Sequence, residues 1–167
     1  MISQERITNP RDLPGRIQVL NRQKRFRICG AAVASFCTEV LRILGAAGPV
    51  LSVAFVGSRA IREMNHKHRG RDYATDVLSY SYGEMRMDGL GFLGEIVIAP
   101  EVAALQAVRY GMEREKELRK LLIHGILHLL GYNHETDRGR MNRIQARLMR
   151  RKSLMGLPSL MDKKEIR

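Results

Sequence analysis

The chain has 167 residues and a formal net charge of +12, with 44% hydrophobic and 28% charged residues. These values are ordinary for a soluble globular protein and fit one domain that buries its own core. No run of eighteen apolar residues occurs, which excludes a helical membrane span. The first ten residues lack the basic-then-apolar pattern of a secretion signal, so we expect a cytoplasmic protein without membrane contact.

The sequence contains two cysteines, Cys29 and Cys37, which fall along one predicted helix. Their separation of eight residues is too long for a disulfide across a straight helix. We therefore expect two free, buried thiols, as is usual in a reducing cytoplasm.

The positive charge is concentrated at the two ends of the chain. Residues 1–27 carry seven basic and two acidic side chains, residues 138–167 carry ten and two, and the middle carries twelve and thirteen. Basic segments of this kind suit a polyanion, and RNA is the commonest polyanion in the cytoplasm. The alternative is that these charges only solvate the ends, but their placement favours a nucleic-acid contact.

Hydrophobic periodicity and turn residues predict strands and helices that alternate along much of the chain. In order, we predict an irregular lead-in over 1–15, a strand over 16–21, a helix over 28–44, a strand over 50–56, a helix over 58–66, a strand over 76–82, a glycine-rich loop over 83–93, a strand over 94–99, a helix over 101–110, an apolar helix from 118 to about 130, and a last helix over 138–155. Asp137 is the expected cap of the last helix, which carries a stripe of arginines. We assign residues 16–157 to one domain and residues 158–167 to a basic C-terminal tail.

Residues 118–134, LRKLLIHGILHLLGYNH, are the most distinctive stretch. The apolar residues do not keep to one stripe, which is typical of a helix buried in the middle of a domain. His124 and His128 lie four residues apart and therefore on one face of that helix. Gly131 can take the left-handed conformation that ends a helix, which leaves His134 free to approach the other two rings.

Three imidazoles brought to one point predict a metal site with a vacant position. Single histidines in apolar helices are often hydrogen-bonded core residues, but leucine neighbours offer no polar partner for two buried rings. A bound cation removes the free-energy cost of burying two rings without polar partners. We predict one Zn²⁺ per chain, held by His124, His128 and His134, with Ni²⁺ or Co²⁺ as acceptable substitutes.

A second polar stretch, NHKHRGRDYATDVLSYSY, covers residues 65–82. His66 and His68 could be extra ligands, but we interpret them as exposed loop residues because three histidines already complete the site. Arg69 and Arg71 are either plain surface charge or a bidentate clamp for a phosphate, and composition does not choose between them.

A metal site with three histidines and an open position favours hydrolysis, because zinc lowers the pKa of bound water to about 7 and polarises carbonyl or phosphoryl oxygens. The spacing of the histidines and the glycine is that of zinc peptidases with the H-E-x-x-H-x-x-G-x-x-H motif. Gly125 stands where those peptidases have their catalytic Glu, so their general base is missing. The basic ends of the chain indicate a phosphodiester substrate instead.

The segment HGILHLLGYNH closely resembles the H-G-x-L-H-L-x-G-Y-D-H signature of the YbeY family, the bacterial rRNA maturation factors and endoribonucleases. NHKHRGRDYATDVLSY and LGEIVIAPEVA are similar to two further segments of that family, and the resemblance extends over about residues 16–157. It implies an α/β (α+β) fold: a single domain with a four-stranded mixed sheet and helices packed around a buried central helix that carries the histidines. It also implies metal-dependent cleavage of single-stranded RNA, maturation of the 3′ end of small-subunit 16S rRNA, and ribosome quality control, with the ribosome as a partner.

By the same resemblance, His124, His128 and His134 match the metal ligands of the family, and Arg69 matches an arginine that engages RNA phosphate. Asn133 stands where the family usually has Asp, and an amide cannot act as a base. The last helix is often acidic in the family but strongly basic here.

We therefore hypothesise a nuclease in which a metal held by the three histidines polarises the scissile phosphate or supplies hydroxide, with His124 and Arg69 as catalytic residues. The general base is unassigned, although Glu135 and Asp137 are close in sequence. Two rival functions are a non-catalytic RNA-binding or ribosome-binding module stabilised by its metal, and a zinc peptidase with an unconventional base.

Overall fold

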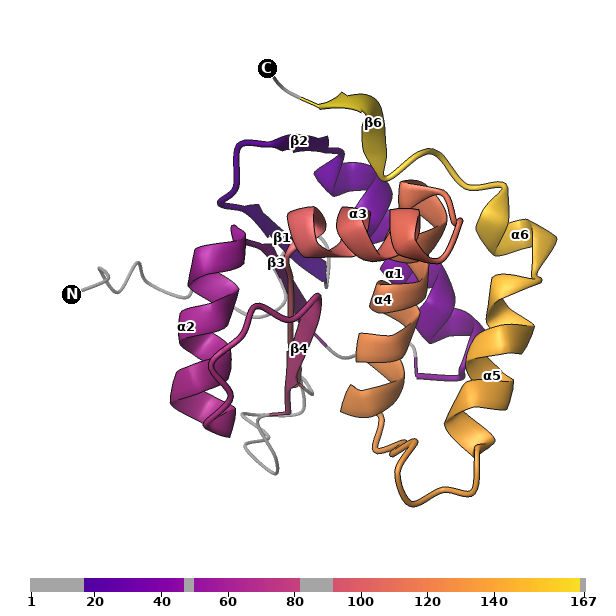
Figure 1. Ribbon diagram of the computed structural model, residues 1–167. Coiled ribbons are helices and arrows are strands. Elements are labelled where there is room, and N and C mark those ends of the chain that lie inside the picture. The colour runs from indigo at the N-terminus through magenta and orange to yellow at the C-terminus, as the bar shows by residue number, and fades with distance from the viewer. Residues whose placement is uncertain (1–16, 47–49, 82–91, 166–167) are drawn as a thin grey trace, which may run out of the picture.

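The computed structural model describes residues 17–46, 50–81 and 92–165 (Figure 1). The predicted lead-in over residues 1–15 and most of the predicted loop over 83–93 lie outside these ranges. The elements follow in this order: β1 Ile17–Asn21, β2 Phe26–Ile28, α1 Gly30–Ile43, β3 Val50–Phe55, α2 Ser58–Arg69, β4 Val77–Tyr80, β5 Phe92–Ile98, α3 Pro100–Arg109, α4 Arg114–Leu129, α5 Arg140–Met149, α6 Lys152–Met155 and β6 Met161–Glu165.

Four strands form a mixed sheet in the order β1-β3-β5-β4. β1 and β5 are parallel to β3, whereas β4 runs antiparallel to β5. The central strands β3 and β5 are apolar along most of their length because both faces of the sheet are covered. This arrangement confirms the predicted fold class.

The two faces of the sheet belong to two hydrophobic clusters, because successive side chains of a strand point to opposite sides. Val53 and Ile96 face the larger cluster, which contains α1 and α4. Ala54 and Val97 face the smaller cluster, which contains Ile61 of α2. The domain therefore has α2 on one side of the sheet and the remaining long helices on the other (Figure 1).

Helix α4 is the central helix that the sequence predicts. It contacts α1, α3 and α5 as well as strands β4 and β5. Gly125 lets it approach the sheet closely, since a Cβ atom there would lie 2.8 Å from Cδ1 of Ile96. Gly131, at φ +89°, ends the helix in the predicted left-handed conformation. Among the described residues, no helix is both long and apolar enough to cross a membrane.

The C-terminal part differs from the prediction in two ways. The single helix expected over residues 138–155 is divided into α5 and α6, because Arg151 is extended and turns the chain so that Leu154 is buried. Residues beyond 157, expected as a basic tail, include the strand β6, which pairs antiparallel with β2. Neither of these two short strands is apparent in the sequence pattern.

Arg119 of α4 fastens this C-terminal segment to the domain. Arg119 is 4% exposed, and its side chain donates hydrogen bonds to the backbone carbonyls of Leu154, Leu157 and Pro158 at 2.6 to 3.0 Å. Glu115, one turn earlier, pairs with Arg119 and accepts a hydrogen bond from the backbone N–H of Leu160. The segment after α6 is thus held by a charged pair on the central helix.

Helix α2 extends further than predicted, to Arg69, and ends at Gly70 with φ +65°. His66 and His68 are exposed as expected, but they lie on the last turns of this helix instead of in a loop. Arg62 binds Asp72 through two hydrogen bonds of 2.8 and 2.9 Å. This pair holds the start of the connection to β4 against α2.

Candidate metal centre

The three histidines singled out by their spacing lie around one point. His124 and His128 project from the same face of α4, and the turn at Gly131 returns His134 toward them. The ring centroids are 4.6 Å apart for His124 and His128, 5.1 Å for His128 and His134, and 5.4 Å for His124 and His134. One nitrogen from each ring lies within 4.8 Å of the other two, so the group could hold a metal ion.

The outer ring nitrogens of two of these histidines have hydrogen-bond partners that fix their protonation. Nδ1 of His124 lies 3.0 Å from Oε1 of Gln145, and Nδ1 of His128 lies 3.1 Å from the carbonyl oxygen of Tyr132. Both partners are acceptors, so each Nδ1 carries the proton and each Nε2 presents a lone pair.

These two Nε2 atoms are only 3.1 Å apart. Two lone pairs at this distance repel each other unless a cation lies between them. Nitrogens that share a tetrahedral zinc ion at its usual bond length lie about 3.3 Å apart. The donor set therefore fits a borderline cation such as Zn²⁺.

Burial also favours the neutral forms of His124 and His128, and a metal ion binds neutral imidazole. Burial lowers the pKa of His124, although the Gln145 hydrogen bond and the Asp76 carboxylate act in the opposite direction. Burial likewise lowers the pKa of His128, and the neighbouring histidines and Arg69 lower it further. The rings are not fully buried, however: His124 and His128 are partly exposed and His134 is exposed. The site is consequently accessible from one side.

That accessible side is a cavity of about 430 Å³ between the end of α4, β4 and the end of α2. Its walls are formed by Arg69, Ser79, Ser81, His128, Leu129, Gly131, Tyr132, Asn133, His134 and Glu135. Arg69 is thus brought to the histidines from the opposite side of the sheet. The structure thus places a cationic hydrogen-bond donor and two hydroxyl groups beside the histidine group.

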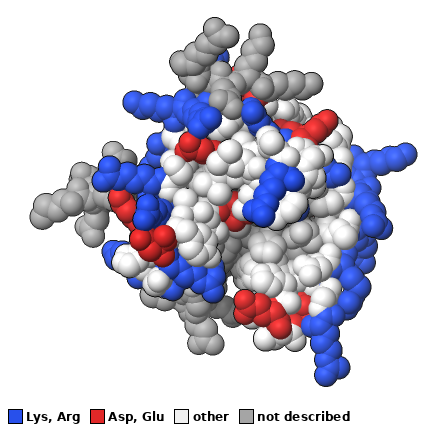
Figure 2. Space-filling view, in the orientation of Figure 1, with Lys and Arg blue, Asp and Glu red and all other residues white. Residues whose placement is uncertain are grey.

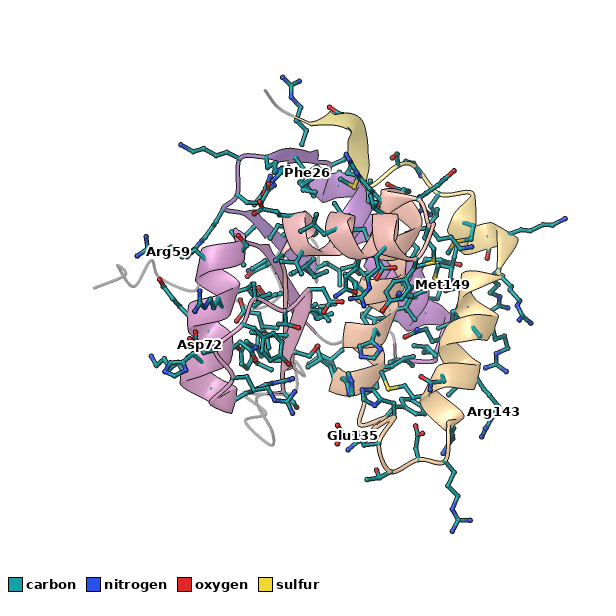
Figure 3. All side chains as sticks on the ribbon, in the orientation of Figure 1. Phe26, Arg59, Asp72, Glu135, Arg143 and Met149 are labelled. Atoms are coloured by element: carbon teal, nitrogen blue, oxygen red, sulfur yellow. The ribbon has the colours of Figure 1, made fainter. Side chains whose placement is uncertain are left out.

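Other polar residues named in the sequence have different positions. His66 and His68 do not belong to any metal-binding group of the described residues. The Asp137 carboxylate accepts hydrogen bonds from the backbone N–H groups of Gly139 and Met141, so it caps α5 from just outside the helix. Glu135 lines the cavity at the end of α4 (Figure 3).

Asn133 is committed to the local turn. Its side-chain oxygen accepts a hydrogen bond from the backbone N–H of Glu135 at 3.0 Å. Such a bond is typical of an Asx turn, and it holds the loop that carries His134. Asn133 therefore stabilises this turn, and that role requires only a hydrogen-bond acceptor in its side chain.

Gln145 and Asp76 are residues of this site that sequence reasoning did not identify. Gln145 is on α5, and Asp76 precedes β4, far from the histidines along the chain. The oxygen of Asp76 also accepts a hydrogen bond from the backbone N–H of Val77. No spacing rule connects either residue to α4, because only the tertiary packing brings them together.

The chain is similar to known proteins of one family. The family described as "Endoribonuclease YbeY" matches residues 18–153. The chain is 37% identical to the endoribonuclease YbeY of Thermodesulfovibrio yellowstonii over 135 residues, which cover 72% of this chain and 85% of that protein. It is also 37% identical to the Anaeromyxobacter protein of the same name over 142 residues, covering 84% and 73%.

Among solved structures, the solution structure of TM1509 from Thermotoga maritima aligns with a TM-score of 0.57 and 29% identity. The alignment covers 84% of this chain and 89% of the other. The family match and the alignments with these relatives extend over most of the chain. The chain belongs to the YbeY endoribonuclease family.

Proposed function

We propose that this protein is a metal-dependent endoribonuclease that cleaves single-stranded RNA in the cytoplasm. Its proposed task is the processing of ribosomal RNA, including 3′-end maturation of 16S rRNA, and ribosome quality control. The observation that carries this proposal is the shared cavity of Arg69 and the histidine centre. The names of the relatives support the same reaction and substrate class.

The side chains around the cavity suit a phosphodiester. Arg69 presents a planar guanidinium that can bind two phosphate oxygens at once. The hydroxyl groups of Ser79 and Ser81 can donate further hydrogen bonds to the backbone of the RNA. A cation held by His124, His128 and His134 would supply Lewis-acid polarisation of a phosphoryl oxygen. Arg69 would then balance the charge that develops as the phosphate reacts.

A peptidase is less compatible with this site. In zinc peptidases the catalytic Glu occupies the position of Gly125. Here that position faces Ile96, whose side-chain atoms lie 2.8 to 3.0 Å from where a Cβ atom would be. A glutamate at this position would have to displace the buried side chain of Ile96.

A purely structural metal is also less compatible with the arrangement. The three histidines come from one helix and the turn directly after it. A cation there closes a short loop and joins no distant elements, so it adds little conformational restraint. The hydrophobic cluster in which α4 packs contains none of the three histidines. We therefore expect removal of the metal to stop cleavage while leaving the domain folded.

The proposal is tested with the purified full chain on a fluorescent single-stranded RNA. We expect His128→Ala and Arg69→Ala each to lower the cleavage rate by two orders of magnitude or more, the usual effect of removing one electrostatic group from a reacting centre. Dialysis against a chelator should abolish cleavage, and Zn²⁺ should restore it. Circular dichroism and thermal unfolding report whether each variant remains folded.

Arg59→Ala is the matched control, because Arg59 is an exposed arginine of the same helix α2 but pairs with Glu63 and does not line the cavity. It should cleave like the parent. Parent-like cleavage by folded Arg69→Ala and His128→Ala proteins would refute the nuclease assignment. Unfolding on chelation would instead support a metal that only stabilises the domain.

A further inference from the structure

The exposed face of α5 carries a row of arginines that the proposed reaction does not use. Arg140, Arg143 and Arg147 are spaced by three and four residues and so point to one side of the helix. All three are exposed. Figure 2 shows Lys and Arg side chains gathered along the edge of the molecule formed by α5 and α6, and Figure 3 shows Arg143 beside α5 at this edge.

These three arginines have no acidic partner among the residues that the structure describes. By contrast, two exposed arginines on other helices have acidic partners: Arg42 pairs with Glu39, and Arg59 pairs with Glu63. Within the part of the chain that the structure describes, the one side-chain hydrogen bond of the row runs from Arg143 to the backbone carbonyl of Arg138. The guanidinium groups of the row therefore present uncompensated charge and free donors to solvent.

The row lines a groove that shares one lining residue with the cavity beside the histidines. The groove has a volume of about 470 Å³ and is lined by Tyr132, Arg140, Arg143, Ile144 and Arg147. Tyr132 also lines the cavity that contains His128 and His134. The guanidinium of Arg140 lies over the Tyr132 ring, 5.3 Å from its centroid. Tyr132 is thus the wall shared by the basic groove and the metal cavity.

We propose that Arg140, Arg143 and Arg147 form a phosphate-binding track that guides single-stranded RNA past Tyr132 to the metal centre. This inference rests on the proposed nuclease function and names the surface that holds the substrate outside the cavity. The row extends over about 10 Å of helix, roughly the length of three stacked nucleotides at 3.4 Å each. A flexible single strand can follow this groove and present its phosphates to the three guanidinium groups in turn.

The test measures binding separately from cleavage. Fluorescence anisotropy of a labelled twelve-nucleotide oligouridylate is followed with the metal-free full chain, at several salt concentrations. The triple variant Arg140→Gln, Arg143→Gln, Arg147→Gln should bind at least about ten-fold more weakly at 0.15 M salt. The slope of log K against log salt should fall by about 2, since each lost phosphate contact on a single strand contributes about 0.7.

A second triple variant, Arg59→Gln, Lys67→Gln, Arg109→Gln, is the matched control. It removes the same charge from exposed positions on α2 and α3, outside both the groove and the cavity beside the histidines. We expect its affinity to stay within about three-fold of the parent, because exposed charges beyond a Debye length are screened. Equal losses of RNA affinity in both variants, or no loss in the α5 variant, would contradict the proposed phosphate-binding track.

Two further measurements separate the alternatives. Polyglutamate of matched charge should compete poorly with the oligouridylate; equal competition would mean an acidic protein partner and would overturn the RNA track. Cleavage by the metal-loaded parent reports on the proposed function alone. If the parent binds RNA through α5 but never cleaves it, the nuclease proposal fails while the track stands.

Discussion

The side-chain oxygen of Gln145 on α5 lies 3.0 Å from Nδ1 of His124 on α4. This hydrogen bond joins two helices and fixes which nitrogen of the imidazole carries the proton. Because the amide oxygen accepts, Nδ1 donates and Nε2 is left free to face the other histidines. The position of α5 is therefore coupled to the ability of α4 to bind a cation.

We expect Gln145→Leu to weaken zinc binding by about 10- to 100-fold, the usual cost of losing a residue that orients a metal ligand. Gln145→Glu keeps an acceptor at the same place and should bind zinc at least as tightly as the parent. Competition with a chromogenic chelator measures both affinities. An unchanged zinc affinity in a folded Gln145→Leu protein would show that the hydrogen bond does not orient His124.

The contact between Gly125 and Ile96 makes a second prediction, for stability. In an exposed helix, Gly→Ala would gain about 1 kcal/mol. Here the added methyl group meets the fully buried side chain of Ile96, and overpacking of that kind costs about 1–3 kcal/mol. We expect Gly125→Ala to lower the free energy of unfolding in urea by about 1 kcal/mol net.

Gly30→Ala is the control for this measurement. Gly30 is also in a helix, but a Cβ atom there would lie 3.7 Å from the nearest atom of Val19, an ordinary contact. Its stability should equal or slightly exceed that of the parent. A Gly125→Ala protein that gains stability like the control would contradict the close packing of α4 on β5.

The histidine centre was largely predictable because its geometry is local. His124 and His128 share a helical face through their spacing, and the turn at Gly131 determines where His134 lies. A period of 3.6 residues and one glycine are enough to bring these rings together. The proximity of Arg69, by contrast, depends on how α2 and α4 pack on opposite faces of the sheet. From its sequence context alone, Arg69 could be either a surface charge or a clamp for a phosphate.

The parts that escaped prediction depend on long-range contacts. The pairing of Phe26 with Glu165 joins segments far apart in the sequence, and a three-residue strand such as β2 has no readable periodicity. The break before α6 follows from the burial of Leu154. In the same way, the sequence gives no sign that Gln145 faces another helix, and its contact with His124 arises only because α5 packs on α4.

The two cysteines differ in solvent exposure, although both were predicted to be buried. Cys37 is buried as expected, and burial raises the pKa of its thiol to about 12. Cys29, expected to be buried, is exposed because it precedes the first turn of α1. At pH 8 a thiol-specific reagent should modify one thiol of the native protein and two after unfolding. Rapid modification of Cys37 in a native Cys29→Ala protein would contradict this packing.

Arg119 provides the last prediction. Its guanidinium is buried and satisfies three backbone carbonyls of the segment after α6, while it pairs with Glu115. Arg119→Met removes the cation and its hydrogen bonds to the three carbonyls, and it leaves Glu115 without its charged partner. We expect a loss of about 3 kcal/mol in the free energy of unfolding, as for other broken buried pairs. Arg119→Lys should recover only part of this loss, because one ammonium cannot reach all three carbonyls.

Arg42→Met is the control, since Arg42 forms an exposed pair with Glu39 on α1 and should leave the stability unchanged within error. Limited proteolysis separates local from global effects: the Arg119 variant should be cut after α6 at protease levels that leave the parent intact. Equal stability and equal protection of the Arg119→Met and Arg42→Met proteins would mean that β6 is held by its pairing with β2 alone. In that case the charged pair on α4 would be dispensable, and the C-terminal strand would owe its place to backbone hydrogen bonds and the burial of Leu160.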